Sequence, residues 1–409
     1  MHSEQITLIV ALLLLASIVA GKASTRLGIP ALLGFLLIGM LAGSEGPGKI
    51  PFDNPGIAEL VGVMALSLIL FAGGADTEWA SIRSIVREGM LLSTAGVTTT
   101  ACLIALFARY VFGWPFPEGL LLGAIVSSTD AAAVFGTFRA KRLALPQRLR
   151  SLLEFESGSN DPFACFLVLA LIAFLAHPAL RPSYFAVMLV RQVVVGGAVG
   201  YGIGKLMTLA VNRVRLDYEG LYPVLTVAFV LLAYGLSSIA GGNGFLAVYL
   251  AGIIFGNSEH RHKRRVHRFH DGFAWLMQII LFLTLGLQVF PSRLAAVAGP
   301  ALLVAIFLMF VARPAPVVAL LTGSKFAWNE RFVAAWAGLR GAAPIVLATI
   351  PAHAGVTNAQ RIFDVVFFVV LLSALVQGVS IGWLSVRLGL RADSTQQPHE
   401  PQRIEAPAA

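Results

Sequence analysis

A group of acidic and amide side chains stands directly before a long apolar run near the middle of the chain. Its residues are Glu154, Phe155, Glu156, Ser157, Gly158, Ser159, Asn160, Asp161 and Pro162, and the apolar run spans residues 163–176. A carboxylate at membrane depth costs roughly 2.5–3.5 kcal/mol on insertion scales, so a chain that keeps one there usually needs it for transport or for an internal ion pair. The group therefore indicates ion chemistry inside a membrane.

Asp161 is the candidate for an exchangeable ion site. On a helix, Ser157 and Asp161 lie four residues apart and share a face, as do Glu156 and Asn160. One carboxylate can hold a proton or a monovalent cation but hardly both, so competition for Asp161 would couple the two fluxes. The alternative is that Asp161 is only a structural acid. Asn160 would either position the site, which we favour, or ligate the cation.

The two glutamates of the group have other interpretations. Glu156 is a second buried acid, and an unpaired one would be expensive, so we expect an arginine inside the apolar blocks as its partner. Arg313 and Arg340 are the two candidates, and we favour Arg313. Glu154 either lines an entrance for the cation or meets the basic loop at 148–150.

Composition requires a membrane to surround these residues. The chain has 409 residues, of which 57% are hydrophobic and 12% charged, whereas soluble domains carry about 25% charged residues. A helical span needs about 20 apolar residues, lipid excludes open sheets, and the apolar blocks do not alternate as barrel strands do. The sequence therefore predicts an all-α polytopic membrane protein.

The apolar residues form thirteen blocks that alternate with basic loops. The blocks are approximately 4–21, 29–44, 56–75, 89–112, 118–138, 147–176, 183–212, 220–240, 243–257, 271–290, 296–322, 328–351 and 359–388. Most Lys and Arg residues fall in alternate loops, so the net charge of +9 indicates topology rather than nucleic-acid binding. This alternation predicts thirteen spans, with the N-terminus outside and the C-terminus in the cytoplasm.

Thirteen blocks can be divided into two repeats and a connector. Residues 4–176 and 220–388 would be inverted six-helix repeats, and 183–212 the connector. Residues 1–390 would form one membrane domain, and the polar tail 391–409 is expected to be disordered. The connector carries glycines at 196, 200 and 204, which suit either internal helix packing or a subunit contact.

Inverted repeats should place interrupted helices in the fifth and twelfth blocks. The fifth contains Ser127-Ser128-Thr129-Asp130, and the twelfth a Gly/Pro-rich stretch around Arg340. If the fifth helix unwinds there, the carbonyl of Thr129 and the carboxylate of Asp130 become oxygen ligands for a cation. The alternative is that Asp130 only caps the following half-helix.

No enzymatic chemistry is visible. The chain has no zinc-protease motif, no phosphate-binding Gly-rich loop and no CxxC pair, so we expect neither an enzyme nor a cofactor. Cys102 and Cys165 lie inside apolar runs and are interpreted as packing residues.

Four motifs together resemble those of the CPA1 group of monovalent cation/proton antiporters, most closely the bacterial NhaP-type exchangers of Na⁺ or K⁺ for H⁺. They are Ser128-Thr129-Asp130, Glu156-Ser157-x-x-Asn160-Asp161, Ala312-Arg313-Pro314 and Gly338-Leu339-Arg340-Gly341-Ala342. The resemblance implies an NhaA-like fold with crossed interrupted helices. It also implies a homodimer in the bacterial cytoplasmic (inner) membrane, with a dimerisation domain and a mobile core that gives elevator-like alternating access.

The resemblance also assigns roles to individual residues. It implies that Asp161 carries both cation and proton, and that Asp130, Thr129 and Ser157 help to form the site. Glu156 would pair with Arg313, while Arg340 would stabilise the broken helix. Asn160 stands where electrogenic relatives have an aspartate, which implies an electroneutral one-for-one exchange.

The chain also departs from the pattern of these relatives. An acidic residue often follows the Leu-Phe pair of the third span, but here Ala72 follows Phe71. Potassium-type relatives often carry large cytosolic domains, so the short tail indicates either a minimal antiporter or a shortened chain. Two alternative functions remain at this point: an ion-coupled symporter of an organic or anionic solute, and a channel-like or sensor protein.

Overall fold

The computed structural model describes residues 3–27, 29–52, 54–141 and 143–390. Every regular element in this part of the chain is a helix, which confirms the predicted all-helical class. The predicted disorder of the tail 391–409 falls outside the described residues. The helices α1 to α9 and the π-helical turn η1 have these bounds: α1 Ser3–Leu27, α2 Ala31–Ala42, α3 Pro55–Asp76, α4 Trp79–Ile82, α5 Val86–Leu91, η1 Leu92–Gly96, α6 Val97–Phe112, α7 Phe116–Ser127, α8 Ala131–Ala140 and α9 Gln147–Ala176.

The second half of the chain continues in the same manner. Its helices are α10 Pro182–Arg213, α11 Leu221–Ile239, α12 Gly244–Gly256, α13 Lys263–Leu287, α14 Pro291–Phe307, the π-helical turn η2 Leu308–Ala312, α15 Pro314–Leu320, α16 Trp328–Trp336, α17 Ala342–His353 and α18 Ala359–Arg387. Ten helical stretches of the described chain are long and apolar enough to cross a membrane, and α2, α12 and α17 are shorter apolar helices. The chain is thus a multispan membrane protein.

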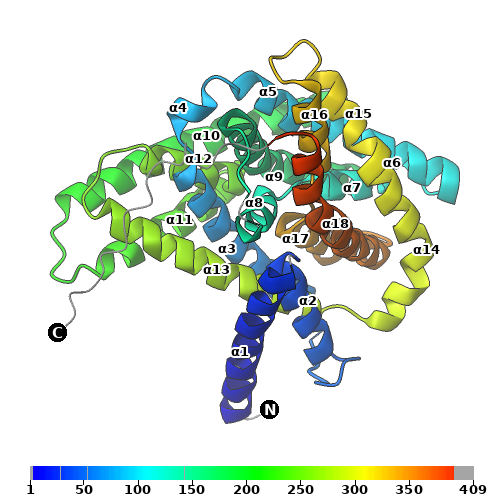
Figure 1. Ribbon diagram of the computed structural model, residues 1–409, viewed down its shortest axis with the longest axis horizontal. Helices are drawn as coiled ribbons and strands as arrows, with labels where there is room; N and C mark the ends of the chain where they lie inside the picture. Colours follow the sequence, from blue (N-terminus) through cyan, green and yellow to red (C-terminus); the bar gives the residue numbers. More distant parts are fainter. Residues whose placement is uncertain (1–2, 28, 53, 142, 391–409) are drawn as a thin grey trace.

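The helices pack as two bundles (Figure 1). The first bundle contains α1–α3 and α10–α13, which pack mainly against one another. The second contains α5–α9 and α14–α18. The bundles meet chiefly where α17 packs on α3 and where α12 packs on α9, so helices from both halves of the sequence contribute to each bundle.

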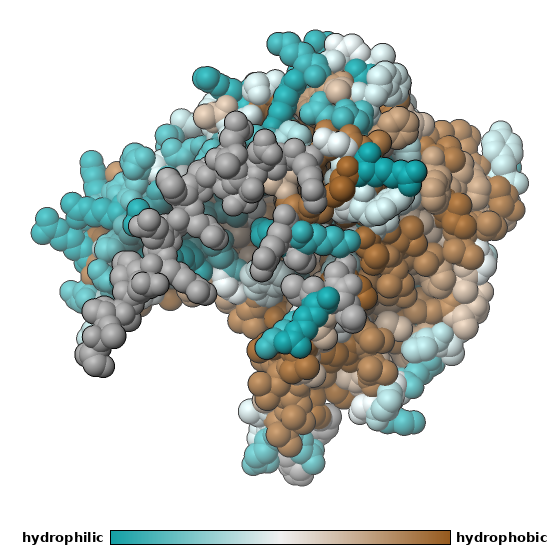
Figure 2. Space-filling model, in the orientation of Figure 1, coloured by the Kyte–Doolittle hydropathy of each residue, from teal (hydrophilic) through white to brown (hydrophobic). Residues whose placement is uncertain are grey.

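The surface of the molecule suits a lipid environment. Figure 2 shows a broad hydrophobic surface on the side occupied by α14 and along α1, with hydrophilic side chains gathered elsewhere. Large apolar side chains of both helices are exposed there, including Leu12, Leu15 and Ile18 of α1 and Leu302 and Ile306 of α14. Such a large apolar surface would be unfavourable in water and favourable in contact with acyl chains.

The glycines of α10 pack inside the molecule. A Cβ at Gly196 would lie 2.8 Å from the carbonyl oxygen of Asn243, and a Cβ at Gly200 would lie 2.9 Å from the Cα of Ala247. A Cβ at Gly204 would lie 3.1 Å from the Cα of Ala251. The three glycines therefore let α10 approach the backbone of α12, and the structure favours internal packing over a subunit contact for this stripe.

Both predicted interruptions are present. The helix of the fifth block stops at Ser127 and resumes as α8 at Ala131. The helix of the twelfth block stops at Trp336 and resumes as α17 at Ala342. By contrast, α9 runs unbroken from Gln147 to Ala176 although it contains Pro162. These three elements position the candidate site.

Candidate ion-binding site

Asp130 caps the second half of the interrupted fifth helix. It occupies the N-cap position of α8, and its Oδ1 accepts a hydrogen bond from the backbone N–H of Ala133 at 3.1 Å. Its own N–H donates to the carbonyl of Leu339 at 2.8 Å, which joins the two interrupted segments. The capping role expected as one alternative is therefore present, and the carboxylate is at the same time fixed beside the break.

Arg340 satisfies the end of the first half-helix. Its Nη1 donates to the carbonyls of Ser127 and Ser128, at 2.7 and 2.8 Å. The last carbonyls of α7 have no helical partner, and a buried cation at a helix C-terminus also complements the helix dipole. The backbone N–H of Arg340 donates to the hydroxyl of Ser373 in α18 at 3.1 Å. Arg340 therefore bonds the carbonyls at the end of α7, and its stabilising role stays a prediction.

α9 crosses directly over the break between α7 and α8. The hydroxyl of Ser157 donates to the carbonyl of Thr129 at 2.9 Å and accepts from the N–H of Ala131 at 3.0 Å. The amide nitrogen of Asn160 donates to the hydroxyl of Thr129 at 2.6 Å. These bonds stand in for helical hydrogen bonds that the unwound residues cannot make.

Asp161 is buried at the centre of this arrangement. Only 6% of its surface is exposed, and its Oδ1 accepts a hydrogen bond from the hydroxyl of Ser128. Asp130 is close enough to act on it electrostatically. Carboxylate, hydroxyl and carbonyl oxygens of Asp161, Ser128, Ser157 and Thr129 thus gather around one break. Oxygens of these kinds are the ligands that hard cations prefer.

Glu156 is paired with Arg313. Its Oε1 lies 2.5 Å from Nη1 of Arg313, and both side chains are buried. Arg313 sits between the π-helical turn η2 and Pro314, whose ring prevents a regular helix at this point. Arg340 makes no ion pair with Glu156 among the described residues. Glu156 thus has a fixed countercharge, which a buried charge requires.

Asn160 contacts the break between α7 and α8, whereas Glu154 lies farther toward the start of α9 and contacts Arg150. Asn160 holds Thr129, as a positioning residue would, and its Oδ1 has no hydrogen-bond partner in the described part of the chain. Glu154 accepts from Nε of Arg150 at 2.9 Å and remains partly exposed. It also lies within electrostatic reach of Asp76 and Glu78 at the start of the α3–α5 connection. Glu154 therefore contacts the basic stretch 148–150, which forms the first turn of α9 and is not the loop expected from the sequence.

Sequence reasoning missed two contacts of this site. The sequence marks Ser128 as a polar residue of its block and as part of a motif but assigns it no contact, and in the structure its hydroxyl donates to Asp161. Asn243 stands between two apolar blocks, at 220–240 and 243–257, and its amide nitrogen donates to the carbonyl of Pro162 at 2.8 Å and to Oε1 of Gln192 at 3.2 Å. The buried Asn243 caps α12 and reaches into α9 of the other bundle. Its place in a Gly-rich turn between two apolar blocks was the available signal.

Comparison with known proteins identifies the family. Residues 10–387 match the family model described as sodium/hydrogen exchanger, transmembrane. The chain belongs to this family. Membership puts this exchanger among monovalent cation/proton antiporters, which are transporters rather than enzymes, and confirms the resemblance seen in the sequence motifs.

Two curated relatives show how much of the exchanger is shared. The K(+)/H(+) antiporter NhaP of Alkalimonas amylolytica is 41% identical over 402 residues, which cover 98% of this chain and 70% of the relative. The K(+)/H(+) antiporter NhaP2 of Shewanella sp. (strain ANA-3) is 42% identical over 377 residues, covering 91% of this chain and 65% of the relative. The exchanger thus spans about two thirds of the length of these relatives.

A solved structure shares the fold. The sodium proton antiporter MjNhaP1 from Methanocaldococcus jannaschii, determined at pH 8, superposes with a TM-score of 0.80 at 24% sequence identity. The match covers 94% of this exchanger and 99% of that chain. The architecture of two bundles around interrupted helices is therefore a known membrane fold.

Proposed function

We propose that this exchanger moves a monovalent cation, Na⁺ or K⁺, across the membrane in return for H⁺, with Asp161 as the shared carrier. The observation that carries the proposal is that three acids at or beside the break have different partners. Glu156 has a fixed arginine partner, Asp130 is held by its own helix N-terminus, and Asp161 is bonded only by the hydroxyl of Ser128 in the described chain.

A hydroxyl partner suits a carboxyl group that alternates between a charged and a protonated form. The Ser128 hydroxyl can donate to a charged carboxylate, and after rotation it can accept from a protonated one. The carbonyl of Thr129 has two lone pairs and gives one to Ser157, so one lone pair remains for a cation. Asp161, Thr129 and Ser157 would therefore ligate the cation, while Asn160 and Asp130 position them.

The relatives favour K⁺ as the cation, since both carry K(+)/H(+) antiporter in their names. A single titrating carrier exchanges one cation for one proton, so we propose an electroneutral cycle. In vesicles, a clamped membrane potential should then leave cation uptake unchanged. Uptake driven uphill by the potential alone would exclude this stoichiometry.

The two bundles suggest how access alternates. The interruptions and α9 lie in the second bundle, so this bundle would carry the site as a rigid body while the first bundle remains still. We propose that the first bundle forms the dimer contact. We also propose that α10 connects two inverted repeats, at about 4–176 and 220–388. Thirteen segments would then cross the membrane, with the N-terminus outside. The three short apolar helices would complete that number. We also propose the bacterial cytoplasmic membrane as the location.

Replacing Asp161 tests the carrier directly. We expect Asp161→Asn to abolish cation-dependent dequenching of a pH dye in proteoliposomes, because the amide cannot exchange a proton. Asp364→Asn is the matched control: Asp364 is also buried in the second bundle, in α18, but contacts Gln360 rather than the break. Both variants should unfold near the wild-type temperature. Full exchange by Asp161→Asn would refute the proposal.

A further inference from the structure

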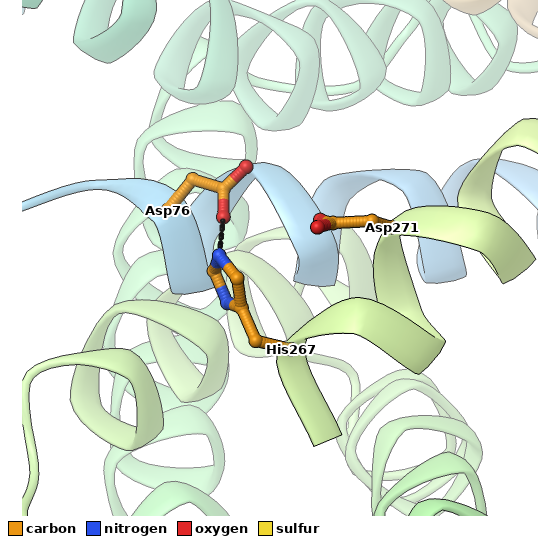
Figure 3. Close-up of side chains that lie close together, drawn as sticks. All are labelled: Asp76, His267 and Asp271. Atoms are coloured by element: carbon orange, nitrogen blue, oxygen red, sulfur yellow. Dashed lines mark ion pairs between the residues drawn. The ribbon is translucent and has the colours of Figure 1, made fainter. Parts of the chain in front are cut away.

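A second group of ionisable side chains lies away from the break, where α3 ends beside the first turns of α13. It consists of Asp76, His267 and Asp271, and we call it the α3–α13 cluster. Each side chain offers one ligand atom, and these atoms all lie within 4.8 Å of one another. Figure 3 shows the two carboxylates and the imidazole gathered around one space.

The cluster is built on elements whose positions are fixed. His267 and Asp271 are four residues apart on α13, so both project from one face of that helix. Asp76 is the last residue of α3, and its Oδ1 lies 2.8 Å from Nε2 of His267 (Figure 3). Below them the buried His270 places its Nε2 2.8 Å from the hydroxyl of Thr226 in α11. α3 and α13 also pack against each other, with the ring of His270 against that of Phe71, while the three side chains of the cluster stay exposed.

The types of these atoms suit a transition-metal site, and their spacing of up to 4.8 Å would have to close to that of a bound ion by side-chain rotation. Ligand bonds of about 2.0–2.1 Å put neighbouring ligand atoms about 3.0–3.4 Å apart. The Asp76–His267 pair, now at 2.8 Å, would have to open by only a few tenths of an ångström. An imidazole with two carboxylates suits Zn²⁺ or Mn²⁺, whereas Ca²⁺ and Mg²⁺ prefer all-oxygen shells. Two carboxylates also balance a divalent charge.

We propose that Asp76, His267 and Asp271 bind a divalent transition-metal ion such as Zn²⁺, with water completing its shell. Two nearby basic side chains would repel a bound metal ion. Lys263 acts on His267 and Arg139 acts on Asp271 electrostatically, but the two aspartates lie nearer and hold the ligand atoms. The cluster is separate from the break at Asp161, so the metal is not the transported cation.

The metal would also act on transport, an inference that rests on the function proposed above. Asp76 lies within electrostatic reach of Glu154 near the N-terminal end of α9, and for this effect we propose that the transported cation enters past Glu154. A divalent ion bound by Asp76 and Asp271 neutralises the two carboxylates, which removes negative charge that would attract a cation near Glu154. We therefore expect Zn²⁺ to slow exchange.

Direct binding is the first test, and it needs no transport. The purified full chain in detergent would be titrated with Zn²⁺ in competition with a chromogenic chelator. We expect His267→Gln and Asp271→Asn each to weaken Zn²⁺ binding at least about tenfold, because each removes one of three ligands. His353→Gln is the matched control: His353 lies 3.8 Å from Glu59 but belongs to no group of three ligands in the described chain.

Thermal unfolding gives an independent measurement. Zn²⁺ should raise the unfolding temperature of the wild type and of His353→Gln, but not that of His267→Gln or Asp271→Asn, because only the folded cluster binds metal. Wild-type Zn²⁺ affinity in both cluster variants would overturn the site. If binding is lost in these variants while Zn²⁺ still inhibits their exchange as it does the wild type, the proposed effect on the entrance is wrong. The Asp161→Asn variant tests the carrier by exchange, whereas the metal site is tested by Zn²⁺ binding. Failure of the carrier assignment can therefore be distinguished from failure of the metal site.

Discussion

At the scale of single residues, the contact with the Ser128 hydroxyl distinguishes Asp161, the proposed carrier, from Glu156 and Asp130. We expect Ser128→Ala to weaken the apparent affinity for the transported cation about three- to tenfold, because it removes the hydrogen bond that holds the Asp161 carboxylate, worth about 0.5–1.5 kcal/mol. The measurement is the KM for cation-dependent dequenching in proteoliposomes. Ser127→Ala is the control, since the Ser127 hydroxyl donates to the carbonyl of Ala124 within its own helix. Equal KM values for the two variants would contradict this role of Ser128.

The same contact shows what the sequence could and could not predict about the site. Acids inside an apolar block are costly wherever they lie, so Glu156 and Asp161 were visible as candidates from composition alone. The direction of the Ser128 hydroxyl was not visible, because it depends on how α9 crosses the break between α7 and α8. That crossing joins residues 33 positions apart, a separation at which local patterns carry no information.

At the scale of elements, the two helix breaks can be predicted from the residues of their own blocks, but the contact between the two breaks cannot. Polar residues in one apolar block and Gly with Pro in another predict broken helices. The bond from Asp130 to the carbonyl of Leu339 and the contacts of Arg340 with Ser127 and Ser128 arise only when the two blocks cross. The glycine stripe of α10 was equally ambiguous, because spacing permits a close approach but does not identify the partner helix.

Two glycines of α10 allow a matched test of that approach. A Cβ at Gly200 would lie 2.9 Å from the Cα of Ala247, whereas a Cβ at Gly197 meets nothing within 4 Å. We expect Gly200→Ala to lower the thermal unfolding temperature in detergent, because backbone atoms of α12 would have to move. Gly197→Ala should be neutral or slightly stabilising, since Ala favours a helix by up to about 1 kcal/mol over Gly. Equal unfolding temperatures would show that α10 and α12 adapt to the extra methyl group.

At the scale of the whole molecule, the two bundles must separate locally if the second one moves. Asn243 of α12 bonds to the carbonyl of Pro162 in α9, directly after the carrier, and α17 packs on α3. A cycle in which the second bundle shifts as a rigid body has to break such contacts and form others. A cycle in which only side chains move would keep them. The sequence predicted the interruptions but not these contacts, because each bundle mixes helices from both halves of the chain.

A reversible cross-link between the bundles distinguishes the two cycles. Gly62 of α3 faces Val346 of α17, and a Cβ at Gly62 would lie 3.5 Å from the Cβ of Val346, within the range that a disulfide spans. In a background with Cys102 and Cys165 replaced by alanine, we expect Gly62→Cys with Val346→Cys to lose exchange on oxidation and to recover it on reduction. Each single cysteine should be insensitive to both treatments. If the fully cross-linked protein still exchanged cations for protons at the uncross-linked rate, the contact between α3 and α17 would persist through the cycle. Transport would then have to proceed without movement of one bundle past the other.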